Sequence, residues 1–212
     1  MEWLWPIFIG VGLSAACGFR VFVPLLIMSL AAHTGFLKLS PGFEWLGSWP
    51  AITALAIATL LEIGGYFIPW LDNLLDAIAT PAAVLAGILA TASLLGDLSP
   101  FLRWALAIIA GGGAAGIIQA STTALRGLSS TTTGGLANPA FSIFELLGAI
   151  GISIFAILTP LFAIIVVVTL IAFVVSRFFK RRYHTGGKHS KTKKDGFVKS
   201  RHSGGNRSPG YL

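Results

Sequence analysis

Residues 61–81 have the sequence LEIGGYFIPWLDNLLDAIATP, in which Glu62 lies inside an apolar run. A proline then breaks the run, two more carboxylates follow one helical turn apart, and Thr80-Pro81 restarts it. An ionisable group at membrane depth costs roughly 2.5–3.5 kcal/mol on insertion scales, so it normally faces a partner or a water-filled cavity. Glu62 therefore requires a partner, and the arginines at comparable depth are Arg20 and Arg126.

The composition is typical of an integral membrane protein. The chain has 212 residues, of which 55% are hydrophobic and 11% charged, whereas soluble domains have about 25% charged residues. Eleven of the fifteen Lys and Arg residues lie after position 176, so the net charge of +7 belongs to a C-terminal tail. This distribution argues against a nucleic-acid-binding domain. The single cysteine, Cys17, excludes an internal disulfide.

Proline residues divide the apolar part of the chain into about six transmembrane segments. Thr, Ser or Asn precedes a proline in a pairing typical of an N-cap and a first helical residue. These pairs are Thr80-Pro81, Ser99-Pro100, Asn138-Pro139 and Thr159-Pro160. The segments predicted in this way are 3–32, 51–68, 82–96, 101–121, 140–158 and 160–178.

The first of these segments carries Arg20 near its middle and Pro24 one turn later. Proline kinks a helix, so we expect a bend or a discontinuity around residues 18–20. The alternative is that Arg20 lies near the end of a shorter span and extends to the interface.

We therefore expect an all-α fold, a polytopic membrane helix bundle with proline-broken helices over residues 1–178. The basic residues after the last segment predict a cytoplasmic C-terminus and a multi-pass protein of the inner membrane. With six spans, the N-terminus is cytoplasmic too. Residues 179–212 are expected to be a disordered tail that contacts anionic lipid headgroups.

Two polar stretches are expected on the cytoplasmic side. Asp72 and Asp76 lie one turn apart on a predicted amphipathic helix, where they either bind a divalent cation or form a solvated face; no third ligand is nearby. Residues 121–139 are rich in hydroxyls and glycine and are predicted to be a loop, either an ordinary solvated one or one that holds an anion or lines a polar cavity. The candidate residues of that loop are Thr131, Thr132 and Asn138.

The two halves of the chain, 1–81 and 82–178, share an order of features. Each has an arginine, then a carboxylate in the next segment, then a Thr-Pro restart: Arg20, Glu62 and Thr80-Pro81, then Arg126, Glu145 and Thr159-Pro160. Halves with three segments each would have opposite topology. The pattern predicts an inverted repeat, a common plan of secondary transporters.

These same motifs support a family resemblance. The segment Ala-Ala-Cys-Gly-Phe-Arg at 15–20, the run 62–81, the run from Arg126 through Asn138-Pro139 and Ser142 to Glu145, and Thr159-Pro160 are similar to the bacterial membrane family catalogued as domain of unknown function 4126. The resemblance covers roughly residues 8–170 and implies a small multi-pass membrane protein with no established activity. Leu146 follows Glu145 where the family leads us to expect a second acidic residue, which weakens a metal-site interpretation.

Two functions compete. The first is a small transporter or channel-like protein for an ion or small solute, with Arg20, Glu62, Arg126 and Glu145 as transport or ion-pair residues. The alternative is a membrane scaffold or assembly factor whose buried ion pairs are structural. A metal-dependent enzyme acting on a lipid headgroup ranks last, because the sequence offers no nucleophile–base pair. We expect no cofactor, the lipid bilayer as partner and no nucleic acid; self-association is left open.

Overall fold

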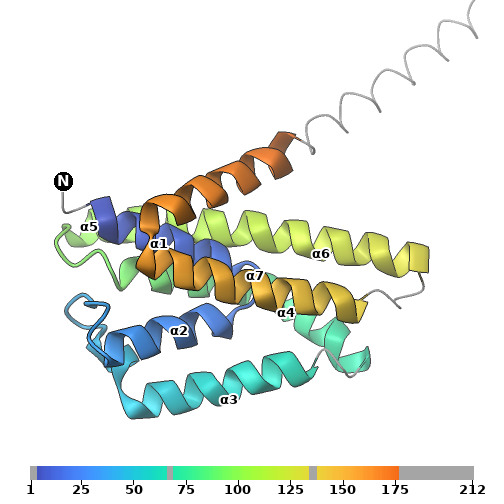
Figure 1. Ribbon diagram of the computed structural model, residues 1–212, viewed down its shortest axis with the longest axis horizontal. Helices are drawn as coiled ribbons and strands as arrows, with labels where there is room; N and C mark the ends of the chain where they lie inside the picture. Colours follow the sequence, from blue (N-terminus) through green and yellow to red (C-terminus); the bar gives the residue numbers. More distant parts are fainter. Residues whose placement is uncertain (1–3, 66–68, 134–137, 177–212) are drawn as a thin grey trace, which may run out of the picture. The chain divides into compact units, whose positions relative to one another are not determined.

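The computed structural model describes residues 4–65, 69–133 and 138–176, with side chains described except at 69–77, 130–133 and 138–139. The predicted basic tail lies outside the described residues. The chain divides into two compact units, Met1–Ile171 and Ala172–Leu212, and the packing described below is that of the first. The described elements are all helical, with no strand among them, which confirms the all-α prediction (Figure 1). In order they are α1 (Leu4–Cys17), α2 (Phe22–His33), the 3-10 helix η1 (Glu44–Gly47), α3 (Trp49–Gly65), α4 (Pro69–Ala92), α5 (Pro100–Leu106), the π-helix η2 (Ala107–Gly112), α6 (Gly113–Thr133), α7 (Asn138–Leu158) and a helix over Pro160–Ser176.

Helices α1 and α2 form an antiparallel hairpin (Figure 1). Gly10 in α1 packs against Thr91 near the C-terminal end of α4. Ser93, just beyond that end, donates a hydrogen bond to the Met28 sulfur of α2 at 3.5 Å. The outer parts of both helices therefore lie at the same end of the bundle. At 1.5 Å per residue, helices of this length reach only about 20 Å from that end before the chain reverses.

The hairpin corrects one sequence expectation and confirms another. The discontinuity predicted around residues 18–20 is confirmed, because α1 ends at Cys17 and α2 begins at Phe22. A single segment over 3–32 is wrong, since the chain turns back at this discontinuity instead of continuing through it. Pro24 lies in the first turn of α2, where a helix does not use the backbone donor that proline lacks.

Helix α4 continues through Pro81, so the restart predicted at Thr80-Pro81 is wrong. The predicted amphipathic helix, residues 70–79, and most of the predicted segment 82–96 belong to this one helix, which ends at Ala92. Packing explains the continuity: a stripe of buried alanines keeps helical register on both sides of the proline, at Ala79, Ala83, Ala86 and Ala90. The other three pairs do coincide with helix starts, and the Ser99 hydroxyl accepts a hydrogen bond from Leu102 N–H at 3.5 Å.

The loop predicted over 121–139 is also largely wrong. An uninterrupted helix runs from Pro100 to Ser129, and α6 itself extends to Thr133. Hydroxyls in this stretch bond to carbonyls of the preceding turn: Ser121 donates to Ile117 O at 2.6 Å and Thr122 to Gln119 O at 3.0 Å. These hydroxyls therefore find their hydrogen-bond acceptors within the helix and do not require a loop.

Small residues allow α1, α4 and η2 to pack with their backbones close together. The Ser14 hydroxyl donates to Gly87 O at 2.6 Å across α1 and α4. A Cβ at Gly111 would lie 2.6 Å from Gly87 O, so only glycine fits where η2 approaches α4. Close packing through glycine and alanine is the usual solution for helices that associate in lipid.

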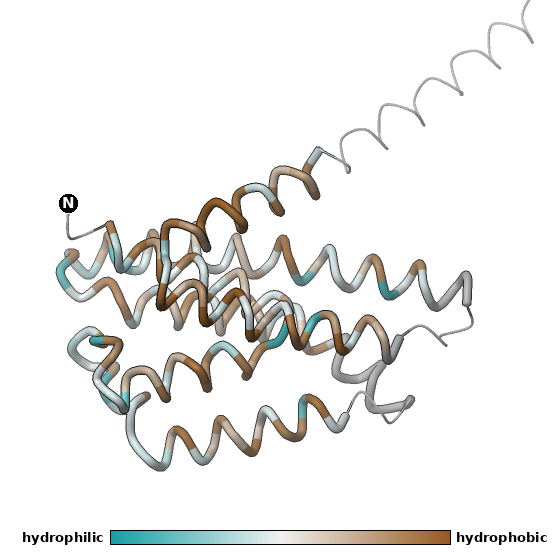
Figure 2. Tube along the Cα trace, viewed as in Figure 1, coloured by the Kyte–Doolittle hydropathy of each residue, from teal (hydrophilic) through white to brown (hydrophobic). Residues whose placement is uncertain are grey.

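The polarity of three helices is reversed relative to a soluble protein. On α3, Glu62 is buried while Leu60 and Leu61 are about 70% exposed. On α7, Glu145 is buried while Phe144 is 75% exposed. On α6 the buried polar residues are Gln119, Thr122, Arg126 and Ser129, and the exposed apolar ones are Ile117, Leu125 and Leu128. Figure 2 shows the apolar stretches along the described helices. A water-exposed helix turns its polar face outward, so this pattern indicates an apolar surrounding.

Two helices, Pro100–Ser129 and Ala140–Leu158, are long and apolar enough to cross a membrane by length and composition. The other apolar helical stretches among the described residues are shorter, at 10–17 residues: Leu4–Cys17, Phe22–His33, Trp49–Gly65, Ile78–Ala92 within α4, and Pro160–Ser176.

Candidate functional site

The break between α1 and α2 is the starting point of the candidate site. A helix start leaves backbone N–H groups without intrahelical partners. At this break the carboxylate of Glu62, from α3, provides the acceptors. Val21 N–H donates to Glu62 Oε1 at 2.8 Å and Phe22 N–H donates to Oε2 at 3.1 Å. Glu62 therefore caps the N-terminus of α2 from a neighbouring helix.

This arrangement answers the question of what stabilises Glu62. The sequence predicts an arginine partner, whereas the two hydrogen bonds described for this carboxylate come from backbone amides. The N-terminus of α2 also carries the positive end of the helix dipole, which favours an anion there. The charges of Arg20 and Arg126 both act on the Glu62 carboxylate as well.

Arg20 lies within the break and is 1% exposed. Its Nη2 atom donates to the backbone oxygen of Ser142 in α7 at 3.0 Å and also to the Ser142 hydroxyl. On the other side, a Cβ at Gly18 would lie 2.6 Å from Ala115 O of α6. The tip of the hairpin is therefore enclosed by α3, α6 and α7.

Arg126 and Glu145 form a buried ion pair between α6 and α7. Arg126 Nε donates to Glu145 Oε1 at 3.0 Å, and Nη2 donates to Oε2. This two-point geometry is the strongest that arginine makes with a carboxylate. Glu145 and Ser142 are three residues apart and share one face of α7, so Arg20 and Arg126 both reach that face.

We refer to Arg20, Glu62, Arg126 and Glu145 as the charged cluster. Its formal charges cancel, and each of the four side chains is less than 9% exposed. Buried charges of this kind persist only when they are paired and hydrogen-bonded. The cluster can exchange an ion or a proton at a carboxylate, or it can fix the packing of α2, α3, α6 and α7.

The remaining sequence candidates are placed only by their backbone. Asp72 and Asp76 fall in the first two turns of α4, Thr131 and Thr132 at the end of α6, and Asn138 at the start of α7. Their side chains lie outside the described ones. Among the side chains that are described, no group of three or more His, Cys, Asp or Glu residues could hold a metal.

Sequence reasoning missed the polar stripe along α6 and the role of Ser142. Gln119, Thr122, Arg126 and Ser129 are spaced three, four and three residues apart, which is the spacing of one helix face. That periodicity was available in the sequence and identifies 121–129 as a helix with a polar inner face. Nothing in the sequence distinguishes Ser142 from other serines as a partner of Arg20.

Comparison with known proteins identifies a family and no closer relative. The family described as Domain of unknown function (DUF4126) matches residues 7–180, most of the chain. No curated protein and no solved structure matches the chain.

Proposed function

The chain belongs to the family described as Domain of unknown function (DUF4126), and we propose that it is a membrane-embedded carrier or channel-like protein for an ion or small solute. The site is the charged cluster at the tip of the α1–α2 hairpin. The first support is the reversed polarity of α3, α6 and α7, which bury charged or polar residues and expose Leu, Ile and Phe. Lipid is the surrounding in which such surfaces are stable.

When the bundle is placed in a membrane with its apolar surface facing lipid, the α1–α2 hairpin is re-entrant: it enters the membrane and turns back without crossing it. Crossings are then made by α3, α4, the helix that starts at Pro100, α7 and Pro160–Ser176, five in all. The basic tail is cytoplasmic by the positive-inside rule. An odd number of crossings places the N-terminus on the opposite side, which replaces the expectation that both ends are cytoplasmic.

The observation that carries the proposal is the capped break itself. Helix ends at membrane depth are tolerated only where they are buried in protein or line a cavity, and secondary transporters bind solutes at such ends. Here Glu62 occupies the helix N-terminus, a position at which anions bind. Protonation of Glu62, or its displacement, would release the amides of Val21 and Phe22 to an incoming anion. One carboxylate then couples the hairpin tip to the carried ion.

The scaffold function remains the second candidate because of the Arg126–Glu145 pair. This pair is bidentate and buried, as a structural ion pair would be. If the whole cluster is structural, exchanging the charges (Arg126→Glu with Glu145→Arg) should preserve function, whereas a transport site that depends on the position of each charge should lose it.

The test is flux in reconstituted vesicles. A thermal-shift screen of purified protein across anions, cations, amino acids and pH identifies the solute, and uptake of that solute is then measured. Glu62→Gln should abolish uptake while the protein remains in the membrane. Asp97→Asn, which neutralises an exposed carboxylate in the 93–99 connection, is the matched control and should transport normally. Normal uptake by Glu62→Gln would exclude the proposed role of Glu62.

A further inference from the structure

A second polar site lies far from the charged cluster, in the connection between α2 and α3. A cavity of about 530 Å³ opens there, which we call the 34–48 cavity. It is lined by Ala32, His33, Gly35, Leu37, Lys38, Leu39, Glu44 and Gly47. Helix α2 separates this cavity from the hairpin tip, a distance of about 18 Å for 12 residues. The cavity is in the size range of small-molecule sites and plays no part in the function proposed above.

The wall of the cavity combines a cation with an anion. Lys38 supplies an ammonium group and Glu44 a carboxylate, and the carboxylate is held because Gly42 N–H donates to Glu44 Oε2 at 2.7 Å. Gly42 adopts a φ of +88°, a conformation that favours glycine and forms this turn. The other oxygen of the same carboxylate, Oε1, is fixed with it. Lys38 and Glu44 therefore place opposite charges on one short loop.

His33 adds a hydrogen-bond acceptor to the cavity wall. Its Nδ1 atom lies 2.8 Å from Gly47 O, and a carbonyl only accepts, so Nδ1 carries the proton. In the neutral ring Nε2 is then an acceptor. The ring also packs edge-on against Trp49, with centroids 4.7 Å apart, which fixes its position.

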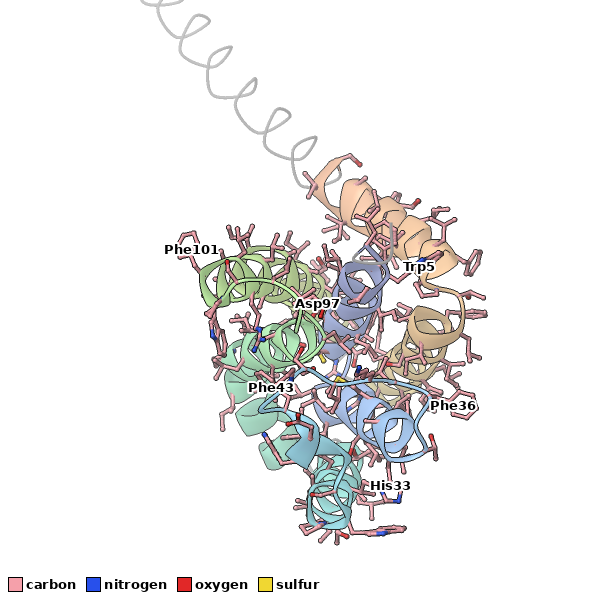
Figure 3. The ribbon with its side chains drawn as sticks, turned by 90° about the vertical axis from the view of Figure 1, so that its left-hand side faces the viewer. Trp5, His33, Phe36, Phe43, Asp97 and Phe101 are labelled. Atoms are coloured by element: carbon pink, nitrogen blue, oxygen red, sulfur yellow. The ribbon has the colours of Figure 1, made fainter. Side chains whose placement is uncertain are left out.

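Exposed aromatic side chains surround this end of the bundle. Phe36 and Trp45 in the connection and Trp49 at the start of α3 are 79%, 56% and 67% exposed. Trp5 and Phe101 lie at the same end (Figure 3) and are also exposed. Rings of Trp and other aromatics mark the depth of the lipid headgroups, where one part of the side chain meets hydrocarbon and another meets water.

We propose that the 34–48 cavity binds the headgroup of an ethanolamine phospholipid. Lys38 binds the phosphate, and Glu44 with His33 accepts hydrogen bonds from the primary ammonium. A choline headgroup has no N–H to donate and binds more weakly. The inference rests on the membrane placement proposed above and is independent of carriage through the charged cluster.

The experiment is native mass spectrometry of the full-length protein in detergent with added phosphatidylethanolamine, phosphatidylcholine or phosphatidylglycerol. Wild type should retain phosphatidylethanolamine best. Lys38→Gln and Glu44→Gln should each reduce its retention by about threefold to tenfold, because each removes one charge-assisted hydrogen bond. Asp97→Asn, an exposed carboxylate at the same end of the bundle (Figure 3) that does not line the cavity, should retain it fully.

Two further arms complete the test. Soluble glycerophosphoethanolamine is added as a competitor: if it displaces the lipid at equal concentration, the ligand is a soluble zwitterion and not a membrane lipid. Glu62→Gln is assayed in parallel and should retain phosphatidylethanolamine, so a failure of the carrier proposal leaves this result intact. Equal retention of the three lipids, unchanged in Lys38→Gln and Glu44→Gln, would overturn the proposal.

Discussion

Replacing Glu62 by glutamine tests the capped helix break most directly. In the wild type the two carboxylate oxygens accept from Val21 N–H and Phe22 N–H at 2.8 and 3.1 Å. Glutamine keeps one acceptor oxygen but presents an NH2 group to the second amide. One buried donor thus loses its acceptor, at a cost of about 1–3 kcal/mol. The lost charge at the helix N-terminus adds up to about 2 kcal/mol in a buried geometry.

The sum, roughly 1–5 kcal/mol, corresponds to a decrease in Tm of about 2–20 °C for a chain of this size. Thermal unfolding in detergent measures it, and hydrogen exchange of the peptide covering Val21 and Phe22 reports on the break itself. Exchange there should be faster in Glu62→Gln, and Glu62→Ala, which removes both acceptors, should be less stable still. Asp97→Asn provides the baseline. A Tm within about 1 °C of wild type, with unchanged exchange at the break, would refute the capping role.

Three further outcomes follow from the packing and the topology. Glu145→Gln should destabilise by about 3–5 kcal/mol because it removes the carboxylate that pairs with the buried Arg126 guanidinium, and Arg126→Met with Glu145→Leu should recover much of that loss; unfolding experiments that rank the double variant below the single one would contradict this. Gly111→Ala should lower the Tm, since its Cβ would meet Gly87 O at 2.6 Å, whereas Gly113→Ala two residues later meets nothing within 4 Å and should be neutral or stabilising. Cysteine introduced beside α2, at Thr34, should react with a membrane-impermeant maleimide in intact cells, whereas cysteine at a tail position should react only after permeabilisation; labelling of both or neither would exclude five crossings.

The all-helical fold and the break near Arg20 could be predicted because both follow from the free-energy cost of local sequence features. A charge and a proline inside an apolar run each disfavour a straight membrane helix, whatever surrounds them. The hairpin could not be predicted in the same way. Residues 3–32 have the length of one tilted span and equally of two half-helices. What stabilises the reversal is Glu62, about 40 residues away in the sequence.

The loop prediction at 121–139 failed because polar composition was equated with exposure to water. In a bundle with an apolar exterior, polar residues belong inside, and the three-and-four spacing of Gln119, Thr122, Arg126 and Ser129 is that of an inward helix face. The partner of Glu62 was missed for a related reason. Charge suggests charged partners, whereas a backbone amide at a helix end has no sequence signature and depends entirely on where the helix starts.

Glu62 and Glu145 hold corresponding places in the predicted inverted repeat, but they differ in the groups that contact their carboxylates. This difference matters for transport. α3 runs from the open end of the hairpin toward its tip, where Glu62 lies, and α7 runs the opposite way, from Ser142 beside Arg20 toward the open end. The inverted repeat stays a prediction. One of its expected features, a helix start at Thr80-Pro81, is not present because this pair lies within α4. Glu145 accepts hydrogen bonds from the charged guanidinium of Arg126, whereas the hydrogen-bond partners described for Glu62 are neutral amides. Neutralising Glu145 therefore removes a charged partner from a buried guanidinium, while neutralising Glu62 leaves amide N–H groups at a helix N-terminus where another anion can bind. Of the two carboxylates, Glu62 is the one whose change of state the fold can accommodate, and its variants should lose flux at a smaller loss of stability than those of Glu145.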